Sequence, residues 1–149
     1  MAELDLPYSN QDYRQRWEHL YTNALSDSQI RDRRPNHEEN QRLHLRAAHH
    51  FIVEAYADEL KQRLCRTWWD LSTLDVLAMR AVAIHHWHIE YAKGLSIDEL
   101  AFALHDEIAH FKLPDPAYRV LHGKLQFWIP HPTRALEPHR GEETQPPNN

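Results

Sequence analysis

Cysteine, glycine and long apolar runs are scarce in this chain, and each shortage narrows the possible folds. The 149 residues include one cysteine, Cys65, and three glycines. A lone cysteine allows no intrachain disulfide, which favours a reducing compartment such as the cytoplasm. So few glycines argue against a sheet protein with many tight turns and fit helices joined by short connections. No stretch reaches the roughly 18 apolar residues of a membrane span, so we expect no membrane association.

An excess of basic residues is also missing. The formal net charge is −5 with the histidines neutral, which argues against a broad nucleic-acid surface. Arg31, Arg33 and Arg34 do gather on one connection, but Asp32 and Glu39 dilute their charge. The chain instead carries 13 histidines. They suggest one hypothesis, a pH response in which buried neutral rings gain charge in acid and destabilise the fold.

Helical periodicity is present over most of the chain. Apolar residues recur at steps of three and four, which predicts five helices over residues 10–25, 36–68, 72–94, 96–111 and 115–128. The predicted buried stripe of the first helix is Tyr13, Trp17, Leu20 and Ala24. Those of the second and fourth helices are Leu45, His49, Ile52, Tyr56, Leu60 and Leu64, and Ile97, Leu100, Ala101, Leu104, Ile108 and Phe111. Short connections between helices favour mostly antiparallel neighbours. We therefore predict an all-α fold, a compact bundle of about five helices.

The two ends of the chain differ from this helical part. Residues 1–8 are expected to form a loose leader without the pattern of a signal peptide. Residues 9–129 are expected to form a single helical domain. From Pro130 the composition is rich in proline and poor in large apolar residues, which predicts a disordered tail over residues 130–149.

The most apolar stretch, residues 72–94, is expected to be the central helix. Ser72 can cap its first turn, and Gly94 can end it in the left-handed conformation. Just beyond, Ser96 and Glu99 have the spacing of a reciprocal capping box for the next helix. A helical wheel predicts that one broad face of the central helix is buried, formed by Leu74, Leu77, Ala78, Ala81, His85, His88, Ile89 and Ala92.

Three histidines, His49, His85 and His88, fall on apolar stripes of the second and central helices. If those helices are neighbours, the three rings can converge with a carboxylate on zinc or iron, with metal-dependent hydrolytic or redox chemistry as a consequence. The alternative is that each ring packs in the core and bonds a backbone carbonyl or a nearby acid. Spacing alone leaves both interpretations open.

Two shorter motifs suggest metal chemistry less completely. Glu107 and His110 have the E-x-x-H spacing of carboxylate-bridged di-metal bundles, but those sites need two such pairs and further glutamates. The string ALHDEIAH, with His105 and Asp106, resembles the LHDIGH string of the HD-domain phosphohydrolases, which implies a metal that activates water. That family also needs a later aspartate, and none follows Asp115, so we do not assign the chain to it.

Nucleophilic catalysis has little support, since no G-x-S-x-G string or glycine-rich phosphate loop is present. Cys65 is interpreted as structural. We predict no catalytic residue and no cofactor, and a small cytoplasmic adaptor or regulatory protein that acts through protein–protein interaction. The candidate surface is an outward apolar pair, Val120 and Phe127, with Lys124 beside it. The partner is another protein or a second copy of the chain.

Overall fold

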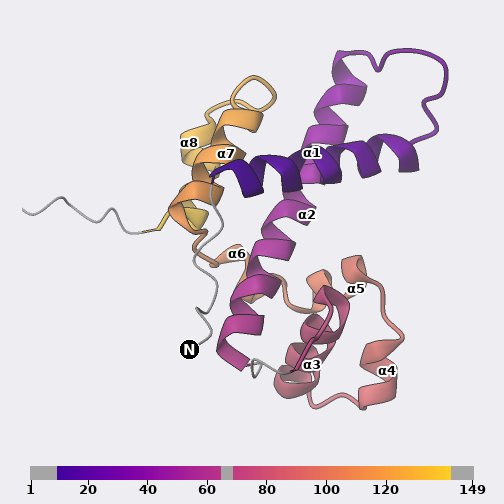
Figure 1. Cartoon of the computed structure of the whole chain (residues 1–149), viewed down its shortest axis with the longest axis vertical. Helices are drawn as coiled ribbons and strands as arrows, with labels where there is room; N and C mark the ends of the chain where they lie inside the picture. Colours follow the sequence, from indigo (N-terminus) through magenta and orange to yellow (C-terminus); the bar gives the residue numbers. More distant parts are fainter. Residues whose placement is uncertain (1–9, 65–68, 142–149) are drawn as a thin grey trace, which may run out of the picture. The chain divides into compact units, whose positions relative to one another are not determined.

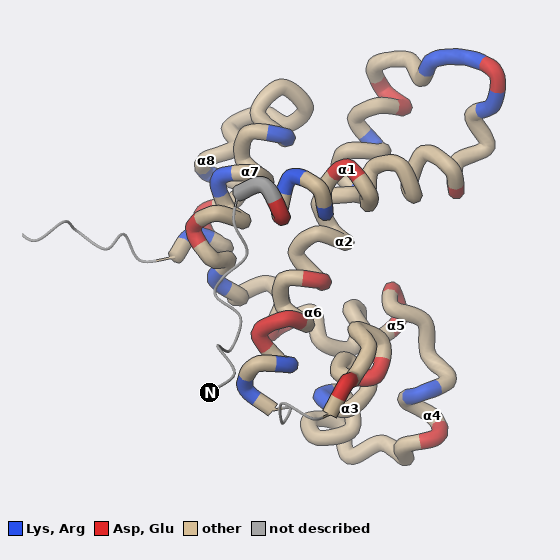
Figure 2. The backbone as a smooth tube through the Cα atoms, viewed as in Figure 1, with Lys and Arg blue, Asp and Glu red and all other residues tan. Residues whose placement is uncertain are grey.

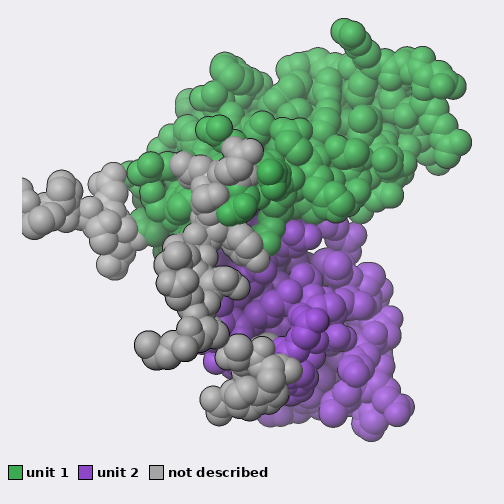
Figure 3. Space-filling model, viewed as in Figure 1, with its two compact units in different colours: residues 1–48, 112–149 green, residues 49–111 purple. Residues whose placement is uncertain are grey.

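The computed structural model describes residues 10–64 and 69–141, and these are helical without a strand (Figure 1). The predicted all-α class is confirmed. The backbone groups into two compact units, where the sequence predicts a single domain. Unit 1 holds the described residues up to Ala48 and from Lys112 onward, and unit 2 runs from His49 to Phe111 (Figure 3). None of the described helices is long and apolar enough to cross a bilayer.

Unit 1 is built around the packing of α1 (Asn10–Asp27) against α7 (Asp115–Leu125). The first part of α2 (His37–Leu64) belongs to the same unit. The predicted apolar stripe of the first helix is confirmed, because all four of its members are buried. The core of the unit contains Tyr13, Trp17, Leu20, Ala24, Leu43, Ala47, Ala48, Leu113, Ala117, Val120, Leu121, Leu125 and Leu136.

The C-terminal part of unit 1 differs from the sequence prediction. Residues 132–135 form α8 (Pro132–Ala135), and residues 137–139 form the 3₁₀ helix η1 (Glu137–His139). Leu136 between them is buried, and the backbone N–H of Leu113 donates to the carbonyl oxygen of His139 at 2.9 Å. Residues 130–141 are therefore ordered where a disordered tail is predicted, because one buried leucine and one backbone bond anchor them. Residues 142–149 lie outside the described residues.

Unit 2 contains the second part of α2 and four shorter helices. These are α3 (Thr73–His85), α4 (Ile89–Lys93), α5 (Ile97–Ala103) and α6 (His105–Ala109), and α3 packs against both α4 and α5. Each large apolar side chain removed from water here contributes about 1.5–3 kcal/mol to folding. The core contains Phe51, Val53, Ala55, Tyr56, Ala57, Leu60, Val76, Leu77, Ala78, Ala81, Ala92, Leu100, Ala101, Leu104, Ile108 and Phe111.

The buried residues of α2 do not follow the single predicted stripe. Leu45 and His49, placed on that stripe, are exposed, whereas Phe51 and Val53 are buried. The 28-residue helix passes through both units, so its buried side changes along its length. The predicted end near residue 68 cannot be compared, because residues 65–68, including Cys65, lie outside the described residues.

The predicted central helix is divided into α3 and α4. Ser72 caps α3 as predicted, accepting a hydrogen bond from the backbone N–H of Asp75 at 3.1 Å. The helix then ends at His86, which takes the left-handed conformation with φ 56° and ψ 34°. Its N–H donates to the carbonyl oxygen of Val82 at 2.9 Å, which closes the last turn. Gly94, the predicted left-handed stop, has φ −82° instead.

The predicted helix over residues 96–111 is likewise divided, into α5 and α6, with Leu104 between them. The capping box is confirmed: the Ser96 hydroxyl accepts from the Glu99 N–H at 3.1 Å, and the Glu99 carboxylate accepts from the Ser96 N–H at 3.2 Å. The apolar stripe of this segment is largely as predicted, with Leu100, Ala101, Leu104, Ile108 and Phe111 buried.

Candidate functional site

The three histidines predicted to lie inside the core are at the surface. The side chain of His49 is 52% exposed, and its Nε2 lies 3.9 Å from Oδ1 of Asp98. His85 is exposed and bonds the carbonyl oxygen of Ala103 through Nε2 at 2.8 Å. His88 is exposed at the N-terminus of α4. The expectation that these rings are buried is wrong, because α2 has a different register and because α3 ends before the second half of the predicted apolar face.

A shared metal site for these rings has no geometric support. Within residues 10–64 and 69–141, no three His, Cys, Asp or Glu side chains are gathered in a way that could hold a metal ion. His49, His85 and His88 therefore do not converge in this structure. Zinc or iron binding by the three histidines stays a prediction that a metal titration can test.

The predicted interaction surface in unit 1 is reduced to one aromatic residue. Phe127 is 81% exposed, as expected for an outward residue. Val120 is only 7% exposed, so its predicted outward position is corrected. Val120 belongs to α7, which packs against both α1 and α8. Lys124 donates from Nζ to Oε1 of Glu18 at 3.0 Å, an ion pair between α7 and α1.

Unit 2 contains an open cleft of about 600 Å³ along α3, α4 and α5. The left-handed turn at His86 ends α3 and starts the short connection that carries Trp87. The capping box fixes the start of α5 and with it the position of Phe102. Figure 1 shows the three helices of this region. The cleft is lined by His85, Trp87, Tyr91, Leu95, Asp98, Glu99, Phe102, Ala103 and His105.

Aromatic rings from two segments line this cleft. On the α3–α4 side, the rings of His85 and Trp87 are stacked at 4.7 Å, and Trp87 meets Tyr91 edge to face at 5.3 Å. On the α5–α6 side, Phe102 and His105 lie 6.0 Å apart between ring centroids. Tyr91 and Phe102 are the large apolar rings among these that are open to solvent, at 58% and 80%. The cleft thus offers aromatic surface to a ligand.

The charged residues of the cleft are acidic. Asp98 and Glu99 belong to its lining, which includes neither lysine nor arginine. Glu99 already accepts the Ser96 N–H through Oε1. Asp98 lies 3.3 Å from Nε2 of His50 through Oδ1, so this carboxylate also has a neighbour in α2. With the histidines neutral, the lining carries negative charge beside its aromatic rings.

A second polar group in unit 2 links α2, α3 and α6 through Glu107. The hydroxyl of Tyr56 donates to Oε2 of Glu107. The guanidinium of Arg80 donates to both carboxylate oxygens, with Nε 3.1 Å from Oε2. The hydrogen bonds from Arg80 are the main cause that lowers the pKa of Glu107, and burial raises the pKa of Tyr56. Glu107 therefore holds the helices together, a role unlike the metal ligand that its E-x-x-H spacing suggests.

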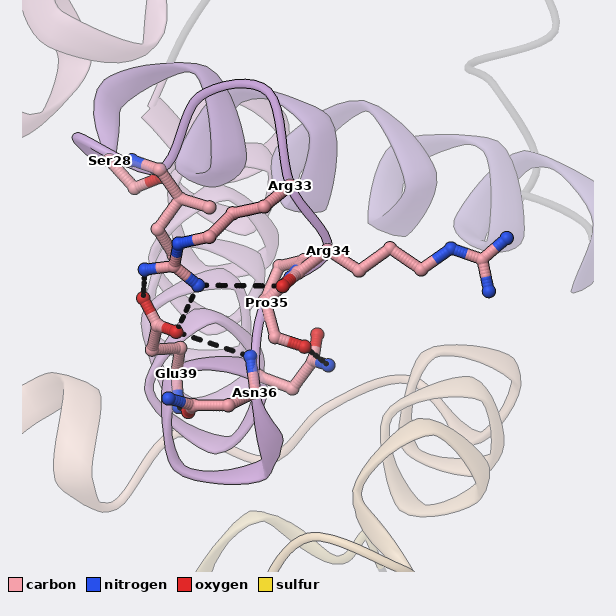
Figure 4. A network of polar contacts seen from close by, with 8 residues as sticks. Ser28, Arg33, Arg34, Pro35, Asn36 and Glu39 are labelled. Carbon is pink, nitrogen blue, oxygen red and sulfur yellow. Dashed lines mark hydrogen bonds and ion pairs between the residues drawn. The ribbon is translucent and has the colours of Figure 1, made fainter.

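The arginine-rich connection between α1 and α2 is organised around the cap of α2. Arg33 forms a two-pronged ion pair with Glu39, with Nη1–Oε1 at 2.7 Å and Nη2–Oε2 at 2.8 Å (Figure 4). Glu39 and Asn36 also exchange the hydrogen bonds of a capping box. The hydrogen bonds from Arg33 are the main cause that lowers the pKa of Glu39 to about 2. Along the connection, Asp32 interrupts the basic residues Arg31, Arg33 and Arg34 (Figure 2).

The sequence offered one signal for the cleft that the helical wheel analysis did not use. Phe102 lies off the predicted stripe of residues 96–111, and a large apolar residue off the buried stripe is a candidate for surface recognition. Trp87 and Tyr91 gave no such signal. Their position at the cleft depends on the break at His86, and no glycine marks that break in the sequence.

Comparison with known proteins yields no relative on which to base a function. No protein-family model, no curated protein and no solved structure matches the chain.

Proposed function

We propose that this chain is a binding protein, an adaptor or regulator that docks a partner protein on the aromatic cleft of unit 2. The observation that carries the proposal is the exposure of Tyr91 and Phe102 at a cleft that Trp87 also lines. Tryptophan, tyrosine and phenylalanine are enriched at protein interfaces, where they supply much of the binding energy. The lone Cys65 favours a reducing compartment, and we place the interaction in the cytoplasm.

The apolar surface around the cleft extends beyond its lining. Ile89, at the first position of α4, is 60% exposed. Ile84, near the end of α3, is exposed as well. Large apolar side chains of this kind contribute to folding only when they are covered, so their gathering on the short helices of one unit favours a covering partner. In unit 1, by contrast, Phe127 is flanked by a buried Val120 and by Lys124 in an ion pair.

Two equally exposed phenylalanines allow a matched test of the docking surface. Phe102 is 80% exposed in unit 2, and Phe127 is 81% exposed in unit 1. The photoreactive residue p-benzoylphenylalanine is placed at one position or the other, and the protein is irradiated in cells that express it. We expect a discrete cross-linked product from position 102 and none from position 127. Mass spectrometry then identifies the cross-linked chain, and a second copy of this chain is recognised by its doubled mass.

Specificity of the cross-link is tested with a second change in the same protein. Trp87→Leu keeps an apolar side chain but removes the largest ring of the cleft. It should weaken the product from position 102 while circular dichroism shows the helices intact. Equal products from positions 102 and 127, or a product unaffected by Trp87→Leu, would contradict docking at this cleft.

A further inference from the structure

We propose that the cleft binds the side chain of an arginine presented by the partner protein. This inference rests on the docking function proposed above and adds the chemistry that the cleft recognises. It combines two properties of the lining: two carboxyl groups, those of Asp98 and Glu99, and aromatic rings contributed by two segments of the chain. The carboxyl groups favour a positively charged ligand, and the aromatic rings favour a flat one that can stack on them.

Charge decides against an anionic ligand. Asp98 and Glu99 are the acidic residues of the lining, and its only other titratable groups are Tyr91, His85 and His105. Two carboxyl groups in a lining without lysine or arginine disfavour a ligand that carries phosphate or carboxylate groups. A cationic group meets opposite charge and enters favourably. Because the cleft is open, screening limits this attraction, and charge alone does not account for tight binding.

The aromatic rings add attraction for a cation. A cation over the face of tryptophan or tyrosine gains about 0.5–1 kcal/mol at an exposed site and about 2 kcal/mol when it is desolvated. His85 stacks on one face of Trp87, and Trp87 meets Tyr91 edge to face, so the ring surface open to a cation is mainly that of Tyr91 and Phe102, which are 58% and 80% exposed. A cation between the two sides therefore contacts aromatic surface and lies near the carboxylates of α5.

Arginine suits this combination better than the other cations of proteins. Its guanidinium group is planar, is weakly hydrated and stacks on aromatic rings, and its five N–H groups donate to carboxylates. A lysine ammonium is more strongly hydrated and does not stack. A trimethylated lysine has no N–H to donate, so Asp98 and Glu99 would be left without a hydrogen bond from it. The carboxylates thus favour arginine over a quaternary ammonium.

The two carboxylates have neighbours that the ligand must share. Glu99 uses Oε1 in the capping box of α5. Asp98 lies near His50 at 3.3 Å and His49 at 3.9 Å, both on α2. His105 lies beside Asp106, with Nε2 and Oδ1 3.2 Å apart. Binding of every ligand is therefore measured at one pH, about 7.5, so that these neighbours are the same in each comparison.

Nuclear magnetic resonance titration of the whole chain tests the inference. The ligands are blocked hexapeptides that differ at one residue: arginine, lysine, trimethyl-lysine or citrulline, the neutral analogue of arginine. The arginine peptide should shift the indole N–H of Trp87 and the amides of α4 and α5. It should bind about fivefold or more tightly than the citrulline peptide, since a cation–π contact and a charge-assisted hydrogen bond are both lost. Lysine should be intermediate.

Two variants and one matched control locate the interaction. Glu99→Gln removes one charge and keeps the side-chain oxygen of the capping box. Glu59→Gln removes the same charge from an exposed position of α2 outside the lining. Trp87→Leu removes the ring. Arginine-peptide binding should weaken about threefold or more in Glu99→Gln and in Trp87→Leu, and by much less in Glu59→Gln.

The results separate this inference from the proposed function. Equal affinity for arginine and citrulline peptides, tighter binding of trimethyl-lysine, or equal effects of Glu99→Gln and Glu59→Gln would overturn arginine recognition. If the peptides fail while position 102 still cross-links a partner, the docking function stands and the arginine inference falls. If the cross-link fails as well, both fall.

Discussion

The hydroxyl of Tyr56 donates its hydrogen to Glu107, the same carboxylate that Arg80 holds from α3. Both carboxylate oxygens therefore have donors, and each donor comes from a different helix of unit 2. The side chains of Arg80 and Glu107 are 28% and 32% exposed, so the group is only partly screened by water. This arrangement makes Glu107 a stabilising residue whose contribution depends on pH.

Glu107→Gln should destabilise unit 2 at pH 7 by about 1–2 kcal/mol, because charge-assisted hydrogen bonds to a partly buried carboxylate are lost. The hydrogen bonds from Arg80 lower the pKa of Glu107 from its ordinary 4.5. Its contribution is therefore present above pH 4.5 and is lost as the pH falls through the folded-state pKa. Urea unfolding at pH 7 and pH 3.5 should show a smaller difference between wild type and variant at the lower pH. Tyr56→Phe serves as the control, since it removes one donor and leaves the Arg80 ion pair; an equal difference at both pH values would contradict the prediction.

Asn36→Ala should destabilise unit 1 by about 1 kcal/mol, the usual cost of losing an N-cap side chain. The Oδ1 of Asn36 accepts the Glu39 N–H at 2.8 Å, and no other residue of that box can replace it. Glu39→Gln should cost less than Glu39→Ala, because glutamine keeps an oxygen for the Asn36 N–H while it loses the charge that pairs with Arg33. Thermal unfolding followed by circular dichroism measures all three. A larger loss in Glu39→Gln than in Glu39→Ala would show that the box is not formed.

His86→Gly should stabilise the chain by about 0.5–1 kcal/mol, since a residue with a side chain is held at φ 56°, where glycine is unstrained. The gain is limited by the greater freedom of glycine in the unfolded chain. His86→Val should be destabilising, because a β-branched residue fits the left-handed region poorly. Denaturant midpoints of the two variants test the turn that ends α3. A stabilising valine would mean that residues 72–94 form one continuous helix, as the sequence predicts.

His44 should make unit 1 sensitive to mild acid. Its ring packs against Trp128 at 4.3 Å and Tyr21 at 4.9 Å, and Nδ1 lies 2.7 Å from the carbonyl oxygen of Asn40. Burial is the main cause that lowers the pKa of His44 below 6.5. A lowered pKa means that stability is present above pH 6.5 and is lost as the pH falls through the folded-state value.

The test of this prediction is the difference between wild type and His44→Asn, whose amide can still donate to the Asn40 carbonyl. The free energy of unfolding of the wild type should fall more steeply between pH 7 and pH 5 than that of the variant. Nuclear magnetic resonance of the His44 ring gives its pKa directly. A value at or above 6.5 would contradict the prediction. This result would bear on the pH response that the 13 histidines suggest.

Metal binding is tested with zinc and iron added to protein purified without a histidine tag. The metal-binding alternative predicts stoichiometric binding and a rise in the unfolding temperature, because a metal held by the folded chain stabilises it. The variant with His49, His85 and His88 all changed to alanine is the control. A metal-dependent rise that disappears in this variant would establish the metal-binding alternative.

The sequence by itself determined the helical class and where most of the helices begin. The caps at Asn36, Ser72 and Ser96 were all predictable, because each cap bonds a backbone N–H only three residues away. The buried apolar stripe of α1 was also predicted from residue spacing. Local spacing is sufficient when a helix buries one face along its whole length. It was insufficient for α2, which passes through both units and buries different sides in each.

Only the tertiary structure decided where the candidate site lies. No glycine in the sequence marks the turn at His86. The ring Nε2 of His85 bonds the backbone carbonyl oxygen of Ala103, 18 residues away in the sequence. That turn, together with the packing of α3 against α5, brings Trp87, Tyr91 and Phe102 to one cleft, where Tyr91 and Phe102 are exposed. Val120 is likewise buried on a helix, α7, that packs against both α1 and α8. Helix caps depend on neighbours in sequence, whereas burial and exposure depend on segments that only folding brings together.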